Sequence, residues 1–283
     1  MPIHAECPPC LKRLVRQLAE LSSDRPEVQA DIVRRGDALV DEAGCRDDLE
    51  PTHVSTRFFR MAKKRSGNPD PFGPRKAHEL RLARAALARA EVPPRSDLAG
   101  RLRLAVAGNA IDFFRPFAQV ERDLRRLPPF AVDHLPRLEA ALNRRSGPLL
   151  YLADNAGEVV FDLPLIEALL ARGADVRLVV KGAPSQNDLT AQDLAAVGPL
   201  PPGLQVVENG TDAVGTQLAE VSAEMRRLIA NAGLLLAKGM ANFESLRAER
   251  RLPPTFFCFI AKCVPNARMA GVAVERRVVL EKE

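Results

Sequence analysis

The second half of the chain alternates short apolar runs with helical stretches, and each of the first five runs ends in polar residues. The first run, PLLYLAD, starts at Pro148 and is followed by the helical stretch VVFDLPLIEALLARG. The next four are ADVRLVVKG, LQVVENG, GLLLAKG and PTFFCFIAKC. Continuous apolar runs are typical of strands buried on both faces. Their alternation with helices predicts a mostly parallel sheet covered by helices on both sides.

The polar ends of these runs predict where a ligand would bind. They are Asp154-Asn155, Lys181-Gly182, Asn209-Gly210, Lys238-Gly239 and Lys262-Cys263. Ligands of open parallel sheets bind beyond the carboxyl ends of the strands. Since all five ends meet at one edge of such a sheet, we expect one shared site there.

The first half has a different pattern. From Leu11 to about Arg145, apolar residues recur three and four apart among Ala, Arg and Glu, and clusters of Pro and Gly separate the stretches. This pattern predicts helices. The sequence therefore predicts an all-helical N-terminal domain at 1–145 and an α/β domain at 146–283.

Composition narrows the class of protein. The chain has 283 residues and a formal net charge of +5, with the basic excess in the first half. No apolar run is long enough to cross a membrane, and the start has no signal-peptide pattern. We therefore expect a cytoplasmic protein, and expect its five cysteines to be free thiols. A basic half fits nucleic acid or a phosphorylated small molecule, or simply a solvated helical surface.

The residue types at the strand ends suit phosphoryl chemistry. The hard oxygen donors are Asp154, Asn155, Asn187 and Asp188. Such donors favour Mg²⁺ or Mn²⁺. The lysines Lys181, Lys238 and Lys262 suit a phosphate. Taken singly, the Asp-Asn-Ala-Gly segment also fits a turn with a helix cap, and each lysine also fits a solvated surface. The phosphate loop GxxxxGK[ST] and the dinucleotide motif GxGxxG are both absent from the sequence.

Several motifs together resemble a known family. They are CPPC at the start, SGNPDPFGPRK from Ser66, AVAGNAIDF from Ala105, LADNAGEVVFD from Leu152, VKGAPSQND from Val180, KGMANFE from Lys238 and KC at Lys262. In order and spacing, the chain resembles the damage-control phosphatases, once catalogued as domain of unknown function eighty-nine. The CxxC start is similar to that of the prokaryotic-type members.

The resemblance implies a Rossmann-like α/β/α domain behind a helical region. It implies a metal-dependent phosphatase for small phosphorylated metabolites, such as sugar phosphates or damaged phosphometabolites, with Mg²⁺, Mn²⁺, Co²⁺ or Ni²⁺. Its metal ligands fall on Asp154, Asn155 and Asp188. Its lysine and carboxylate near the substrate fall on Lys238 and Glu244, with Asn242 between them. Met240 stands where the family commonly has Gln, which puts substrate choice in question.

The remaining candidates extend this hypothesis. Glu158 or Glu244 could position or deprotonate water, and attack by water or by Asp154 are both open. The expected substrate contacts are Asn242, Lys181, Lys262, Asn187, Gly157, Asn68 and Asp70. The last two lie in a Pro-rich loop that either reaches over the site or is a plain turn.

Two further groups have a structural reading beside the functional one. Asn109 and Asp112, three apart on a helix, either line the cleft between the domains or bond within the helical region. Cys7 and Cys10 have the spacing of half a zinc site, to which His4 and Cys45 could contribute, or are simply free thiols.

Two other functions are weighed against the phosphatase. The first is an adenosylmethionine-dependent methyltransferase on a similar scaffold, but that would need an acidic residue where the second strand ends in Lys181. The second is a nucleic-acid binder, which the single tyrosine and the dispersed arginines disfavour. We therefore expect a small phosphorylated metabolite as partner, with no nucleic acid and no membrane. The oligomeric state is left open.

Overall fold

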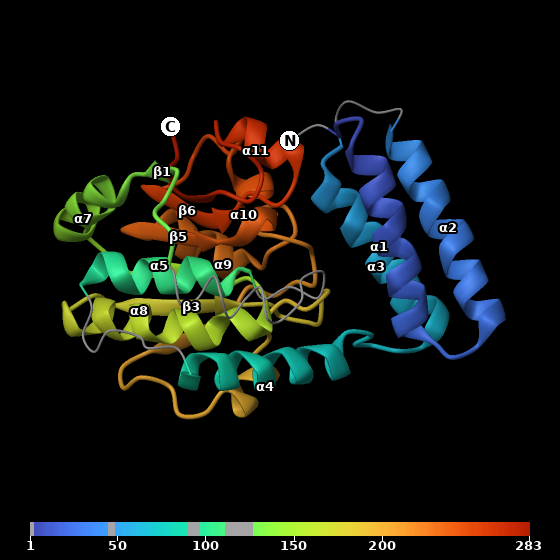
Figure 1. The fold of residues 1–283 in the computed structure, drawn as a ribbon, viewed down its shortest axis with the longest axis horizontal. Helices are drawn as coiled ribbons and strands as arrows, with labels where there is room; N and C mark the ends of the chain where they lie inside the picture. The colour runs from blue at the N-terminus through green and yellow to red at the C-terminus, as the bar shows by residue number, and fades with distance from the viewer. Residues whose placement is uncertain (1–2, 45–48, 90–96, 111–126) are drawn as a thin grey trace.

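The computed structural model describes residues 3–44, 49–89, 97–110 and 127–283. Three long helices stand beside an α/β body, to the right of the sheet in Figure 1. They are α1 (Cys7–Ser22), α2 (Pro26–Gly44) and α3 (Pro51–Ser66). Helix α4 (Gly73–Arg89) runs from this bundle back along the body (Figure 1).

Seven strands in the described chain form one sheet. They are β1 (Val132–Asp133), β2 (Leu149–Leu152), β3 (Val176–Val180), β4 (Gln205–Glu208), β5 (Leu234–Lys238), β6 (Thr255–Ile260) and β7 (Arg277–Glu281). Their order is β1-β7-β6-β5-β2-β3-β4. All neighbouring pairs are parallel except β6 and β7. The predicted α/β fold with a mostly parallel sheet is confirmed, and β2 to β6 are the five predicted runs.

Helices cover both faces of the sheet, because alternate strand residues point to opposite sides. Leu149 and Tyr151 pack on one side, and Leu150 and Leu152 on the other. The first side is covered by α4, α5 (Leu98–Gly108), α7 (Leu135–Arg144) and α8 (Val159–Ala171). The second is covered by α9 (Ala223–Ala230), α10 (Gly239–Leu246) and α11 (Val264–Met269). The continuous apolar runs are explained by this burial on both faces.

Two details differ from the expected elements. The stretch predicted as a helix after β3 forms only a 3₁₀ turn, η2 (Gln192–Ala196), and a second such turn, η1 (Ala156–Glu158), precedes α8. The second difference is strand β1, which the sequence patterns did not predict because a two-residue strand has no periodicity. The division of the chain at residue 145 stays a prediction, although β1 and α7 already belong to the sheet layers.

The strand order reverses between β2 and β5, which lie side by side although β3 and β4 separate them in sequence. The chain winds one way from β2 through β4 and the other way from β5 to β6. The crevice at such a reversal is where α/β sheets bind ligands. This geometry brings Asp154, beyond β2, next to the Lys238-Gly239 end of β5.

The three-helix bundle has its own apolar core and a polar seam with the body. Val15, Ile32 and Phe58 are fully buried inside the bundle. At the seam, the Thr56 hydroxyl accepts from the Val214 backbone N–H at 3.0 Å, and Asp212 pairs with Lys63 from α3. The seam holds α1 and α3 close to the strand ends. In the described part of the chain, no helix has both the length and the apolar character needed to cross a membrane.

Gly36 sets the approach of α1 and α2. A Cβ placed there would lie 2.4 Å from Cγ1 of the buried Val15, a stiff β-branched side chain. We expect Gly36→Ala to lower the free energy of unfolding by about 1–3 kcal/mol, measured by urea denaturation. Gly44→Ala in the same helix is the control, since a Cβ there meets nothing within 4 Å. Equal stability of the two variants would contradict this packing.

Candidate active site

The site begins at the end of β2, where Asp154 lies against the backbone of Gly239. Gly239 has a φ of +76°, and a Cβ on it would be 1.9 Å from Oδ2 of Asp154. A side chain at residue 239 would therefore occupy the place of the carboxylate. The Lys-Gly pair at the end of β5 is explained by this contact, since glycine adopts positive φ and leaves room for Asp154.

The segment after β3 brings Asp188 to the same place. Asn155 and Asp188 form an isolated antiparallel β-bridge. The Leu189 N–H donates to the Asp154 carbonyl at 2.9 Å, and the Ala156 N–H donates to the Asn187 carbonyl at 2.8 Å. Backbone bonds thus gather the three predicted metal ligands at one sheet edge.

The electrostatics of this cluster favour a cation. Burial, followed by the neighbouring carboxylates of Glu158 and Asp188, raises the pKa of Asp154 well above its ordinary value. Burial also raises the pKa of Asp188, although Lys181 lies 3.3 Å away and acts in the other direction. Carboxylates crowded together in a buried place are stabilised by a bound cation.

The donor set fits a hard divalent ion. It consists of two carboxylates and one amide oxygen, from Asp154, Asp188 and Asn155. Within the described residues, no three His, Cys, Asp or Glu side chains are grouped to hold a metal. The proposed three-ligand set therefore includes the amide of Asn155. Oxygen ligands of this kind suit Mg²⁺ or Mn²⁺ better than a soft metal.

Lys238 is buried in a second charged cluster behind the ligands. Its ammonium donates to Asp162 at 2.6 Å, to Glu158 at 3.2 Å and to the Ala105 carbonyl at 3.0 Å. Although burial opposes it, the carboxylates of Asp162 and Glu158 raise the pKa of Lys238. Burial raises the pKa of Asp162 to about 6, against the effect of Lys238. With all three donors engaged inside the protein, Lys238 can support the site but does not face an open cavity.

The other two predicted lysines differ from each other. Lys181 is buried, and it donates to the carbonyls of Ala213 and Gly215. Lys262 instead lines a cavity of about 420 Å³. Burial raises the pKa of Asp154, and the positive charge of Lys262 partly offsets that rise. Of the three lysines, Lys262 is the one placed to meet a ligand's charge.

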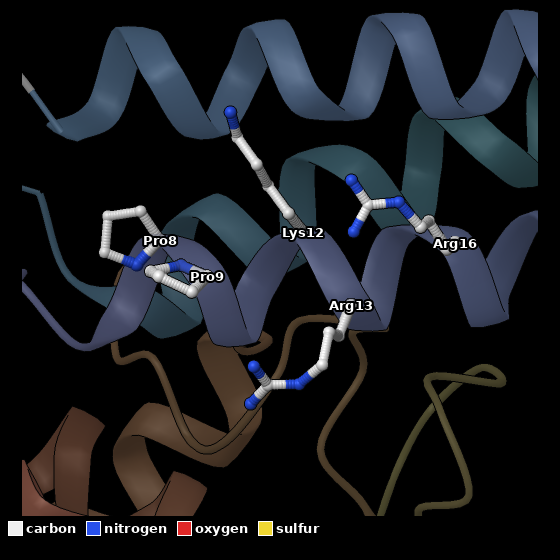
Figure 2. A pocket seen from close by; sticks show the side chains of 5 residues that line it. All are labelled: Pro8, Pro9, Lys12, Arg13 and Arg16. Atoms are coloured by element: carbon white, nitrogen blue, oxygen red, sulfur yellow. The ribbon is translucent and has the colours of Figure 1, made fainter.

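The cavity lies between the helical bundle and the strand ends. The bundle contributes Cys7, Cys10, Arg13 and Ser55, among others, and the body contributes Gln186, Met240, Glu244, Lys262 and Cys263. Figure 2 shows a separate pocket on α1, lined by Pro8, Pro9, Lys12, Arg13 and Arg16. Lys12 and Arg16 extend there on the side of α2, while Arg13 extends toward the body. Lys12 and Arg16 pair with Asp41 and Asp37 of α2. The bundle therefore forms one wall of the cavity.

Glu244 lines this cavity from α10. Its Oε1 accepts from Asn266 Nδ2 at 2.6 Å. Burial raises the pKa of Glu244 to about 7, partly offset by that hydrogen bond. Met240, one turn earlier, accepts through sulfur from the Lys262 N–H at 3.3 Å. Thus the residue that departs from the family pattern contacts the end of β6 and also lines the cavity.

The remaining predicted substrate residues have structural partners. Asn242 donates to the carbonyls of Ala153 and Lys238, which ties β2 to β5. Asn187 donates to Glu79 of α4 at 3.0 Å, and Gly157 is buried in η1. These contacts support the site, and contact of these residues with a substrate stays a prediction.

The loop before α4 is a turn that also supports the site. The Asn68 side chain accepts from the Asp70 N–H at 3.0 Å, as in a plain turn. Asp70 then pairs with Lys76 at 2.9 Å, and Asp193 pairs with it at 3.0 Å. Lys76 is buried, and its positive charge partly offsets the rise in the pKa of Asp188 that burial causes. The loop therefore acts on the candidate ligands through Lys76.

The sequence patterns assign no role to Lys76 or Asp162. Lys76 ends the motif SGNPDPFGPRK, and Asp162 ends the motif LADNAGEVVFD. The signal for Asp162 was its spacing, four residues after Glu158, which places both carboxylates on one helical face. Asn109, expected either in a cleft or in internal hydrogen bonds, contacts Asp154 and Glu158. Its predicted companion Asp112 lies outside the described residues.

Both readings of Cys7 and Cys10, half of a zinc site or free thiols, stay predictions. Cys7, Cys10 and Cys263 line the same cavity and are free thiols in the structure. Burial raises the pKa of Cys7 to about 11. Cys45, which could contribute to such a site, lies outside the described residues.

The raised pKa of Glu244 predicts a pH effect on stability. The folded state keeps a proton that the unfolded chain releases near its ordinary pKa of 4.5. The Glu244 contribution is therefore most favourable below about pH 4.5 and is lost as the pH rises through about 7. Between pH 4.5 and pH 8, wild type should lose on the order of 1 kcal/mol relative to Glu244→Gln, after allowance for partial exposure.

Urea denaturation of both proteins at several pH values measures this difference. Glu20→Gln, an exposed change on α1, is the control and should track the wild type. Parallel stability curves for wild type and Glu244→Gln would contradict the raised pKa.

Comparisons with known proteins agree with this fold. The damage-control phosphatase ARMT1-like domain matches residues 3–278. A damage-control phosphatase of Archaeoglobus fulgidus is 31% identical over 283 residues, covering 97% of each chain. One of Pyrococcus horikoshii is 30% identical, covering 95% of this chain and 94% of that protein. The crystal structure of a DUF89 family protein from Pyrococcus horikoshii has a TM-score of 0.88, with 27% identity and 100% of both chains covered. The chain therefore belongs to the damage-control phosphatase ARMT1-like family.

Proposed function

We propose that the protein is a metal-dependent phosphomonoester hydrolase acting on small phosphorylated metabolites. The observation that carries this proposal is the convergence of Asp154, Asn155 and Asp188 at one sheet edge. The three residues do not line the cavity of about 420 Å³, whose wall includes Gln186, two residues before Asp188, and Lys262. The family supports the phosphatase class. The donor chemistry supports the divalent cation, with Mn²⁺, Mg²⁺, Co²⁺ and Ni²⁺ as candidates.

The residues divide the work by position. Asp154, Asn155 and Asp188 would hold the cation, which supplies Lewis-acid stabilisation of the charge on the phosphoryl group. Lys262 lines the cavity and adds a second positive charge for the phosphate. Lys238 acts behind the ligands, because its three donors are engaged by protein groups.

Of the two carboxylates proposed for proton transfer, Glu244 is the better placed. Glu158 is fully buried, with one oxygen bonded by amides and the other by Lys238. Glu244 faces the cavity, and its pKa is raised to about 7. A carboxyl group with a pKa near the working pH is suited to exchange a proton with the leaving group or with water.

The size and lining of the cavity support a small polar substrate. Pockets for small molecules have volumes of about 300–1,000 Å³, and this one is near the lower end of that range. Its wall contains Arg13, Ser55, Gln186 and Glu244, which could bond to hydroxyl groups. A sugar phosphate or a similar phosphometabolite fits these properties.

The alternatives have less support. A methyltransferase would hold ribose with an acidic residue at the end of β3, and Lys181 stands there, bonded to two carbonyls. Nucleic-acid binding would need free basic side chains, and Lys12, Arg60 and Lys63 are paired with acidic residues.

Phosphate release tests the proposal directly. The protein would be assayed on a panel of sugar phosphates and other phosphometabolites with each of the four metals. We expect metal-dependent release, and we expect Asp154→Asn to lower kcat/KM more than about 100-fold, since even supporting residues of metal sites cost 10–100-fold.

Asp175→Asn is the matched control, because Asp175 is exposed at the opposite end of β3 and pairs with Arg177. It should keep wild-type activity. A wild type that releases no phosphate with any of the metals would refute the proposed function.

A further inference from the structure

Asn109 connects the helical half of the chain to the candidate metal ligands. It caps the C-terminus of α5 and is 1% exposed. The preceding Gly108 lets α5 lie close to α8, since a Cβ there would be 2.8 Å from Cβ of Phe161. This close approach brings the Asn109 side chain behind Asp154.

All the hydrogen-bonding groups of the Asn109 side chain are engaged. Its Oδ1 accepts from the Ile260 N–H, at the end of β6, at 2.9 Å. Its Nδ2 donates to Glu158 Oε1 at 2.6 Å and to Asp154 Oδ2 at 3.2 Å. The orientation of the amide is fixed electrostatically, because the reverse orientation would point its oxygen at two carboxylates and its NH₂ at an N–H donor.

Asn155 makes the same two bonds from the other side. Its Nδ2 donates to Glu158 Oε1 at 2.7 Å and to Asp154 Oδ2 at 3.2 Å. Two amides therefore share two carboxylate oxygens. Since an amide is planar, these two bonds fix the plane and the orientation of the Asn155 amide, and they leave its oxygen out of the contact with the two carboxylates.

Glu158 is fixed from behind by Lys238, which donates to its other oxygen. The last turn of α5 contributes to this as well, because the Ala105 carbonyl accepts from the same ammonium. Glu158 cannot reorient without breaking bonds to a buried lysine. The groups that bond to the Asn109 side chain are therefore themselves held in place: Glu158 by Lys238, and the Ile260 N–H by strand β6. A residue that positions others requires such fixed partners.

We propose that Asn109 is a positioning residue for the metal centre. By holding Glu158 Oε1 and Asp154 Oδ2, it fixes the rotamer of Asp154 and, through Glu158, the amide orientation of Asn155. The effect of Asn109 on catalysis rests on the proposed metal-dependent function. Its effect on cation affinity does not, because that affinity is measured without any substrate.

The test compares three variants with the wild type: Asn109→Ala, Asn109→Ser and Asn231→Ala. The serine variant keeps a small polar side chain at the end of α5 while losing the amide that donates both bonds. Asn231 is the matched control, because it caps the C-terminus of α9 and bonds Arg227 at the surface.

Calorimetric titration of each metal-free protein with Mn²⁺ gives the affinity, and circular dichroism with a thermal scan establishes folding. We expect both Asn109 variants to bind Mn²⁺ about 10–100-fold more weakly than the wild type, and Asn231→Ala to bind it as the wild type does. On an active substrate, the Asn109 variants should require correspondingly more Mn²⁺, with the substrate KM within about twofold of the wild-type value.

Two outcomes would overturn the inference. One is a folded Asn109→Ala or Asn109→Ser protein with wild-type Mn²⁺ affinity. The other is failure of both variants to fold while Asn231→Ala folds, which would assign Asn109 to the fold alone. A wild type that binds Mn²⁺ more tightly than the variants but releases no phosphate would refute the proposed function and leave the positioning role in place.

Discussion

The buried ammonium of Lys238 is the interaction on which the rest of the site depends. It joins the end of β5 to two carboxylates near the start of α8 and to a carbonyl of α5, so three elements meet at one charge. Removing one partner of a buried charge cluster leaves an uncompensated charge and typically costs 3–5 kcal/mol. The cluster lies where the strand order reverses, directly behind Asp154 and Asn155. The side chains that would hold a cation are therefore packed against a cluster of buried, hydrogen-bonded charges.

The candidate site is built by both halves of the chain. Helix α5 supplies the amide of Asn109, α4 supplies Lys76 and Glu79, and α1 with α3 forms a wall of the cavity. The loops after the strands of the sheet provide the candidate ligands, while the helices provide the side chains that hold them and a wall of the cavity. The polar seam around Thr56 and Asp212 keeps the bundle in place over the strand ends.

The fold and the meeting of the candidate ligands at one sheet edge were largely predictable, because both follow from local patterns. Buried parallel strands need continuous apolar runs, and the residues after such strands share one edge of the sheet. Asp154, Asn155 and Asp188 were found this way, with the help of the family motifs. The two-residue β1 has too little sequence to produce a pattern. Which lysine faces a ligand was not predictable either, since Lys181, Lys238 and Lys262 follow strands in the same manner and differ only in what packs around them.

The sequence by itself determined the five buried strands β2 to β6, the edge at which polar groups collect and the resemblance to the family. Only the tertiary structure decided what each polar group does. Lys238 bonds to Glu158 and Asp162, and Lys262 lines the cavity. Asn109 contacts Asp154, a candidate ligand, from a helix end 45 residues earlier in the chain. The physical reason is that the state of a charged or amide group depends on its burial and its partners. Those partners come from distant segments whose approach is set by packing, as at Gly108 and Gly239.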